Sequence, residues 1–249
     1  MDESKKSALE RELARRTRRS FLTMGVSAAA AYGGWRWLRS SPEDGNLARP
    51  FRRILQLNER VAEAYFDPRH LAPTFAPENM EDLRVNGDIG LVDDFDPSQW
   101  RLMVQGLAAG ETHRLSLAEI KSLPRVEDLT QLKCIEGWSV VNQWAGVRFS
   151  DFTQKFAPKS AGARYVSLQT PDKEYFVGLD MPSALHPQTL LCYEMNGAPL
   201  TGEHGAPLRL AIPVKYGIKN IKRIGAITYT GERPRDYWAD DGYDWYAGL

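Results

Sequence analysis

The sequence has few of the residues that build metal clusters and disulfide frameworks. Its 249 residues include two cysteines, Cys134 and Cys192, and four histidines. Two cysteines exclude a disulfide-stabilised scaffold and leave open a single Cys134–Cys192 bridge. The absence of C-x-x-C and H-E-x-x-H argues against a zinc site built by the chain alone. Acidic and basic residues balance at 32 each, so no broad basic field for nucleic acid is expected.

Motifs of nucleotide-binding folds are also missing, because neither G-x-G-x-x-G nor a P-loop occurs and no regular βαβ alternation is visible. Short strand patterns alternate with turns from Leu83 onward, as in residues 101–106, 164–169 and 222–230. Many short strands with a few short helices predict an α+β domain with mixed sheets over residues 83–249.

Local signals place several boundaries within this domain. Ser116 and Glu119 have capping-box spacing and predict a short helix. Ser150 is expected to cap another helix, which ends before Pro158. The dipeptide Asn196-Gly197 follows an apolar run and predicts a tight hairpin turn.

The first 39 residues have the order of an export signal, a basic segment followed by a short apolar one. Residues 17–22, Thr-Arg-Arg-Ser-Phe-Leu, resemble a twin-arginine export signal, which would carry the folded protein to the periplasm. The apolar run ends at Arg36 and is short for a membrane span, which needs about 20 residues. A retained membrane anchor and a basic amphipathic helix are the alternatives. Residues 40–82 are expected to form an extended arm, with an amphipathic helix over residues 47–65.

Cys134 ends a strand predicted over residues 129–135, and three interpretations are open: a core thiol, a nucleophile or a ligand for a soft metal. A nucleophile needs a base, and no protease-type motif accompanies the scattered histidines. A lone thiolate on a metal needs further ligands from an organic cofactor, and a pocket to hold it. Arg209 and Lys222, with glycines nearby, could hold phosphate oxygens there. Cys192 lies in an apolar strand and is interpreted as a core thiol, with a disulfide or a second ligand as alternatives.

Five motifs follow one another along the chain: Cys134–Ser139, Trp144–Arg148, Asn196-Gly197, His204–Arg209 and Lys219–Lys222. Together they resemble the molybdopterin-binding domain of the sulfite-oxidase family, in particular its exported bacterial sulfoxide-reductase branch. The resemblance covers residues 83–231. It implies a sulfite-oxidase-type fold and a molybdenum cofactor in which the pterin dithiolene supplies two sulfurs and Cys134 the third. It also assigns cofactor contacts to six residues: Asn86, Thr170, His204, Arg209, Asn220 and Lys222.

The residues after Cys134 bear on the substrate. Sulfite oxidases have a Gly-Asn-Arg-Arg type run there, which suits an anion, whereas this chain has Glu136-Gly137-Trp138-Ser139 and its next arginine is Arg148. The resemblance therefore implies an exported oxidoreductase that transfers an oxygen atom from a sulfoxide or another small neutral oxidised substrate. A sulfite dehydrogenase and a non-catalytic member of the fold are the alternatives.

Two further expectations concern assembly. No haem or iron–sulfur motif is present, so electrons are expected from a separate haem or membrane partner. The chain ends at Leu249, and no C-terminal dimerisation domain is expected.

Overall fold

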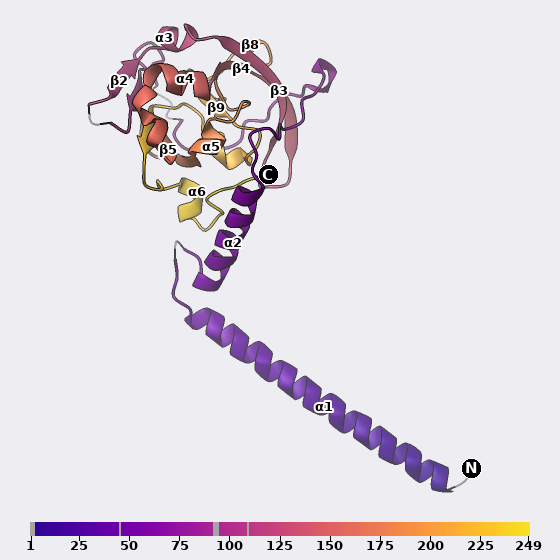
Figure 1. Ribbon diagram of the computed structural model, residues 1–249. Coiled ribbons are helices and arrows are strands. Elements are labelled where there is room, and N and C mark those ends of the chain that lie inside the picture. The colour runs from indigo at the N-terminus through magenta and orange to yellow at the C-terminus, as the bar shows by residue number, and fades with distance from the viewer. Residues whose placement is uncertain (1–2, 45, 92–94, 109) are drawn as a thin grey trace. The chain divides into compact units, whose positions relative to one another are not determined.

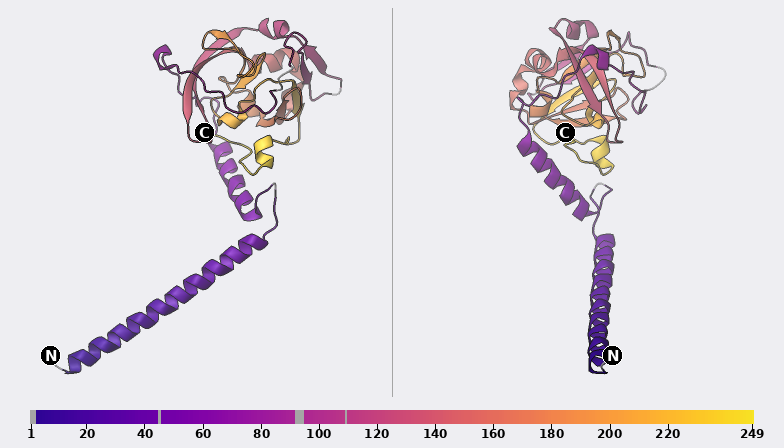
Figure 2. Two further views of the ribbon diagram at one scale, coloured as in Figure 1. Left: turned by 180° about the vertical axis from the view of Figure 1, so that it is seen from behind. Right: turned by 90° about the vertical axis from the view of Figure 1, so that its right-hand side faces the viewer.

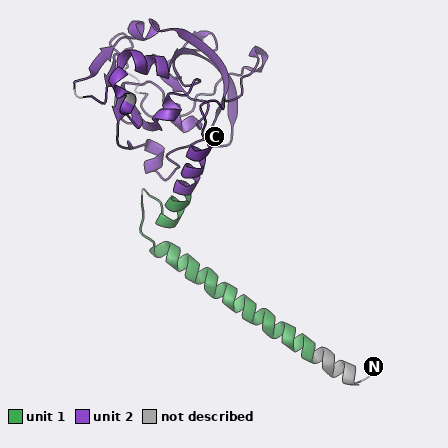
Figure 3. Ribbon diagram, in the orientation of Figure 1, with its two compact units in different colours: residues 1–54 green, residues 55–249 purple. Residues whose placement is uncertain are grey.

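The computed structural model describes residues 3–44, 46–91, 95–108 and 110–249 (Figure 1). The chain divides into two compact units, residues 1–54 and residues 55–249 (Figure 3). The candidate site lies in the second unit.

The first unit is dominated by α1 (Glu3–Ser40), a 38-residue helix. Its apolar side chains are exposed, with Phe21 at 67% and Val26 at 70% of their full accessible surface. No helix within the described residues combines the length and the apolar character needed to cross a membrane. The described part of the predicted export segment, residues 3–39, lies within α1, and its role stays a prediction.

The helix predicted over residues 47–65 is confirmed as α2 (Arg49–Tyr65). Within the second unit it is attached to the domain, because Glu59 is buried and forms an ion pair with Arg233. Ala62 packs in a small cluster with Trp245 and Tyr246. The segment that follows is irregular apart from a short 3-10 turn, η1 (Pro77–Asn79).

Two five-stranded sheets form the domain, which is the predicted α+β architecture. The first has the order β2-β1-β10-β5-β6, with β1 and β10 parallel and the other pairs antiparallel. Its strands are β1 (Leu102–Gln105), β2 (Thr112–Leu115), β5 (Tyr165–Gln169), β6 (Phe176–Asp180) and β10 (Ala226–Thr230).

The second sheet is antiparallel in the order β3-β4-β7-β8, with β9 also paired to β7. Its strands are β3 (Arg125–Lys133), β4 (Ser139–Arg148), β7 (Leu190–Met195), β8 (Ala198–Pro199) and β9 (Arg209–Ala211). β3 and β4 form a long curved hairpin (Figure 1, Figure 2). The pairing of β4 with β7 shifts between Ala145 and Gly146, and such a bulge bends a strand.

Short helices connect the strands: α3 (Leu117–Lys121), α4 (Phe149–Phe156), η2 (Pro158–Gly162), α5 (Met181–Ala184), η3 (Gly217–Lys219) and α6 (Tyr237–Asp240). The capping box at Ser116 and Glu119 is confirmed in both directions. The cap predicted at Ser150 is wrong, because the N-cap of α4 is Arg148, whose side chain makes no capping bond. The helix continues directly from β4, and the Phe149 amide is already bonded to the Thr189 carbonyl.

The main hydrophobic core lies where both sheets meet α4. It includes Leu102 and Val104 of the first sheet, Val147 and Leu191 of the second, and fully buried Phe149. Burial of such a side chain contributes roughly 1.5–3 kcal/mol. This core fixes the frame from which the turns of the candidate site project.

Candidate functional site

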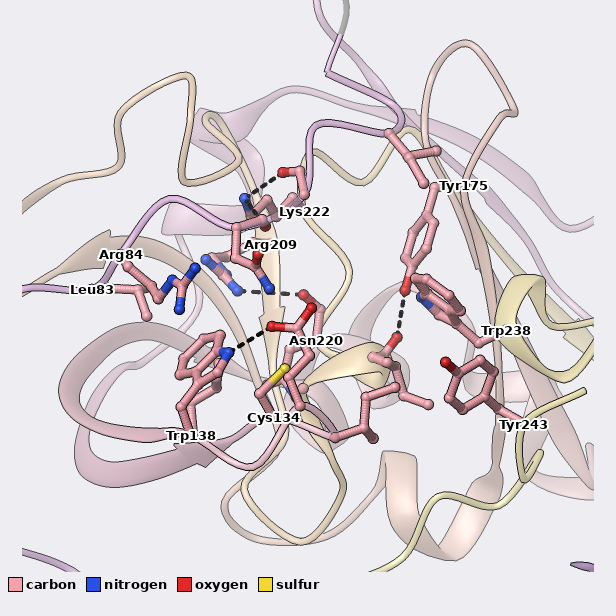
Figure 4. A pocket seen from close by; sticks show the side chains of 18 residues that line it. Leu83, Arg84, Cys134, Trp138, Tyr175, Arg209, Asn220, Lys222, Trp238 and Tyr243 are labelled. Carbon is pink, nitrogen blue, oxygen red and sulfur yellow. Dashed lines mark hydrogen bonds between the residues drawn. The ribbon is translucent and has the colours of Figure 1, made fainter. Parts of the chain in front are cut away.

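A pocket with an empty volume of about 950 Å³, its open mouth included, lies beside Cys134 (Figure 4). Five parts of the chain form it: residues 83–89, the end of β3 with the β3–β4 turn, the β5–β6 turn, the region from β9 to Lys222, and the C-terminal segment that begins with α6. Its size suits a cofactor or a small ligand.

Cys134 is held at the tip of the β3–β4 hairpin. Its amide donates to the Trp138 carbonyl at 2.9 Å, and the Gly137 amide donates to the Cys134 carbonyl at 3.1 Å. Gly137 has φ +89°, a conformation that favours glycine and lets the turn close over so few residues. The strand itself stops at Lys133, so Cys134 lies just beyond the end of β3.

The Cys134 thiol is half-buried, and this burial raises its pKa, with the Glu136 carboxylate acting in the same direction. A raised pKa disfavours the free thiolate that a nucleophile requires. All four histidines are described, and none lines the pocket to act as a base. A bound metal ion would instead deprotonate the thiol directly. The geometry therefore favours the ligand interpretation over the nucleophile.

Arg209 is a buried cation in the pocket lining. Its guanidinium donates to the carbonyls of His204 at 3.0 Å and Asn220 at 3.3 Å and lies over the Trp144 ring. The buried Nε atom has no hydrogen-bond partner, and no carboxylate among the described residues forms an ion pair with Arg209. Burial lowers the pKa of Arg209 to about 10, as expected for an uncompensated cation.

Lys222 lies at the same end of the pocket. Its Nζ donates to the carbonyls of Asn86 and Gly87, each at 2.9 Å. Burial, followed by repulsion from Arg209, lowers the pKa of Lys222 to about 8. A Cβ atom at Gly205 would lie 2.7 Å from the Lys222 Cβ, so the two chain segments meet without room for a side chain. An anionic group would stabilise both cations.

Of the residues predicted to contact the cofactor, Asn86, Arg209, Asn220 and Lys222 line the pocket together with Cys134. The Asn220 side chain also holds the local backbone, since its Oδ1 accepts from the Ile212 amide at 2.9 Å. Its Nδ2 donates to the Tyr216 carbonyl at 3.3 Å.

His204 and Thr170 are absent from the pocket lining. The His204 carbonyl accepts a hydrogen bond from Arg209. The buried Nδ1 of the His204 ring has no partner, and burial lowers the pKa of His204. Thr170 shapes the β5–β6 turn, where its Oγ1 donates to Asp172 at 2.5 Å and accepts from the Tyr175 amide at 3.1 Å. The structure thus places Thr170 behind Tyr175, which does line the pocket.

Four lining side chains were missed by the sequence reasoning: Arg84, Tyr175, Trp238 and Tyr243. The C-terminal segment wraps the domain, since the Tyr216 amide donates to the Ala247 carbonyl and the Leu249 amide to the Val214 carbonyl. The density of aromatic residues over residues 237–246 was the available signal. Nothing in the sequence indicated where they would lie.

The residues present fit a molybdopterin cofactor. Within the described residues, no three His, Cys, Asp or Glu side chains gather into a possible metal centre, so a metal here needs ligands from outside the chain. Cys134 offers one sulfur, and the unpartnered Nε of Arg209 lies at an uncompensated cationic end. Both cysteines are free, and Cys192 is fully buried in a second core cluster with Trp144.

Comparison with known proteins gives a consistent result. The family model for the oxidoreductase molybdopterin binding domain matches residues 89–238. A provisionally named protein-methionine-sulfoxide reductase subunit of Azospira oryzae is 35% identical over 210 residues, which is 83% of this chain and 79% of that protein. The protein-methionine-sulfoxide reductase catalytic subunit MsrP of Xanthomonas campestris is 37% identical over 57% of this chain. That alignment spans 48% of the Xanthomonas protein, about half its length.

The fold is also found among solved structures. The sulfane dehydrogenase SoxCD from Paracoccus pantotrophus superimposes with a TM-score of 0.51 and 16% sequence identity. The match covers 68% of this chain and 47% of that one. At this identity the likeness establishes the sulfite-oxidase-type fold and nothing about the substrate.

Proposed function

Because the chain belongs to the oxidoreductase molybdopterin-binding domain family, we propose that it reduces a sulfoxide or another small neutral oxidised substrate. Methionine sulfoxide, named for two of its relatives, is the first substrate to test. The observation that carries the proposal is the pocket itself, with the Cys134 thiol in its wall and the cations Arg209 and Lys222 at one end.

In this proposal Cys134 and the two cations bind different parts of the cofactor. Cys134 binds molybdenum through its thiolate, and Arg209 and Lys222 hold the anionic end of the pterin, with Asn86 and Asn220 beside them. The bound cofactor supplies the two-electron redox chemistry. The reaction turns a sulfoxide, two electrons and two protons into a sulfide and water. Glu136 lines the pocket, is exposed and accepts a hydrogen bond from Trp138 Nε1, so its carboxylate can carry protons in from solvent.

Sulfite oxidation is the second candidate, and one observation favours it. Arg84 lines the pocket, with its guanidinium 5.2 Å from the centre of the Trp138 ring, so the pocket contains an arginine that the residues after Cys134 did not reveal. Arg148, by contrast, ends β4 outside the lining. A dianion could use Arg84, whereas a neutral sulfoxide has no need of it.

The deciding experiment compares the two reactions on one purified sample made in a molybdenum-competent host. Stoichiometric molybdenum and pterin, sulfoxide reduction with a reduced viologen as donor, and little sulfite oxidation are expected. A well-folded protein without molybdenum would refute the cofactor assignment, and faster sulfite oxidation would replace the reductase with the dehydrogenase. The Cys134→Ser variant should lose turnover with its thermal unfolding nearly unchanged.

We also propose how the chain is delivered and supplied with electrons. Residues 1–39 act as a twin-arginine export signal or a retained anchor, residues 40–82 as the arm with α2, and residues 83–249 as the oxidoreductase domain of a periplasmic protein. A separate haem or membrane protein supplies the electrons. Replacement of Arg18 and Arg19 by lysine should stop export of a fused reporter, and export unchanged would refute the route.

A further inference from the structure

The pocket has an aromatic wall that the motifs around Cys134 do not supply. Tyr175 comes from the β5–β6 turn, and Trp238 and Tyr243 come from the C-terminal segment. In Figure 4 these three side chains lie to the right, across the pocket from Arg209 and Lys222, and Cys134 lies below these two cations. The pocket is therefore cationic at one end and aromatic at the other.

The wall is a connected row of rings. Tyr175 and Tyr237 have centroids 5.2 Å apart, and Tyr237 meets Trp238 edge-on at 5.4 Å. Trp238 in turn meets Tyr243 edge-on at 5.2 Å. Contacts of this geometry fix the rings relative to one another. Trp238 is half-buried and Tyr243 is 41% exposed, so these rings face the pocket and solvent and are not part of the core.

Buried polar contacts hold this row in place. Asp236 caps α6 by accepting from the Ala239 amide at 3.1 Å, and its other oxygen accepts from Lys219 Nζ at 2.6 Å. Both side chains of this ion pair are almost fully buried. Tyr175 is fixed separately, because its hydroxyl donates to the Ile218 carbonyl at 2.7 Å. A wall fixed from two sides is preorganised for a ligand.

We propose that Tyr175, Trp238 and Tyr243 form a specificity subsite for the apolar arm of the sulfoxide, an inference that rests on the proposed function. Aromatic rings bury apolar surface and make favourable contacts with sulfur. Their faces carry negative potential and therefore repel a sulfite dianion. The enzyme therefore prefers sulfoxides with an aryl or long alkyl arm, or a methionine side chain, over dimethyl sulfoxide.

The test compares methyl phenyl sulfoxide with dimethyl sulfoxide on the full-length protein and its Trp238→Leu and Tyr243→Leu variants. Binding is measured by calorimetry on the oxidised protein, where no turnover occurs, and kcat/KM is measured with a reduced viologen. Each variant should lose about three- to tenfold in affinity for the aryl sulfoxide, change little for dimethyl sulfoxide and keep its molybdenum. Tyr65→Leu is the matched control, because the Tyr65 ring is exposed on α2 and lies outside the pocket lining. It should change the affinity for neither sulfoxide.

An unchanged ratio of the two affinities in both variants would overturn the subsite. If Trp238→Leu fails to fold, Tyr243→Leu still decides, because its ring is partly exposed and its loss disturbs little packing. A wild-type protein that binds the aryl sulfoxide selectively but never reduces it would refute the proposed function and leave the subsite standing. Turnover of both sulfoxides with equal affinity would refute the subsite and leave the proposed function standing.

Discussion

Replacement of Asp236 by asparagine should destabilise the domain by about 3–5 kcal/mol at neutral pH, because it leaves a buried ammonium group without its anion. Lys219 Nζ lies 2.6 Å from Asp236 Oδ2, and the side chains are 0% and 2% exposed. Lys219 would keep its bond to the Gly178 carbonyl at 2.9 Å. Asparagine could still cap α6 but would have no second oxygen for Lys219 and the Gly178 amide.

The loss of unfolding free energy in the Asp236→Asn variant should depend on pH in a defined direction. Burial lowers the pKa of Lys219, and the charge of Asp236 opposes this. Without Asp236 the pKa falls further, so the folded variant binds fewer protons than the folded wild type. The destabilisation should therefore be largest at low pH and shrink as the pH rises towards the point where wild-type Lys219 also becomes neutral.

Urea denaturation followed by tryptophan fluorescence at pH 6, 7.5 and 9 measures this effect. Asp240→Asn is the control, because Asp240 pairs with Arg235 at 2.6 Å while both side chains are well exposed, and such pairs contribute up to about 1 kcal/mol. Equal losses in the two variants, or a loss from Asp236→Asn that grows with pH, would refute the reasoning.

Two further predictions concern buried lysines. Lys215 is buried over the Tyr246 ring and 3.3 Å from Asp180, and burial lowers its pKa to about 7. Between about pH 7 and 10 the unfolded chain then binds more protons, so wild-type stability should rise by roughly 2 kcal/mol from pH 7 to 9, and Lys215→Met should abolish that rise in urea denaturation. Burial and repulsion from Arg209 lower the pKa of Lys222 to about 8 in the free pocket, so the affinity of the pocket for the pterin phosphate should fall as the pH rises above that value. Lys222→Arg should retain the cofactor at pH 9, measured as molybdenum left after dialysis, and release at the same pH as wild type would contradict this role.

Local features of the fold could be predicted because short-range physics decides them. The capping box at Ser116 and the hairpin at Asn196-Gly197 each depend on a few neighbouring residues, and both are present. The cap at Ser150 failed because β4 runs straight into α4 and the Phe149 amide finds its partner in a distant carbonyl. A capping motif read from the sequence does not show that the preceding strand leads directly into the helix.

The cationic half of the pocket could be predicted and the aromatic half could not. Cys134, Arg209 and Lys222 each lie in one of the motifs that carry the family resemblance, and the fold brings them to one pocket. Trp238 lies in the short helix α6 and Tyr243 just after it, and the position of this segment depends on Asp236 and on packing across the domain. Such long-range contacts leave no periodic pattern in the sequence.

This division explains why the family establishes the cofactor more firmly than the substrate. The family match ends at residue 238, so it includes the cysteine and both cations but leaves out Tyr243. Arg84, the side chain that favours an anion, precedes the match, which begins at residue 89. Arg84 and Tyr243 thus lie outside the match, at its opposite ends, while Tyr175 and Trp238 lie within it. If the proposed subsite is correct, Arg84 and the aromatic wall set the selectivity between a neutral sulfoxide and sulfite, and Arg84→Gln should reduce any sulfite oxidation while sparing sulfoxide reduction.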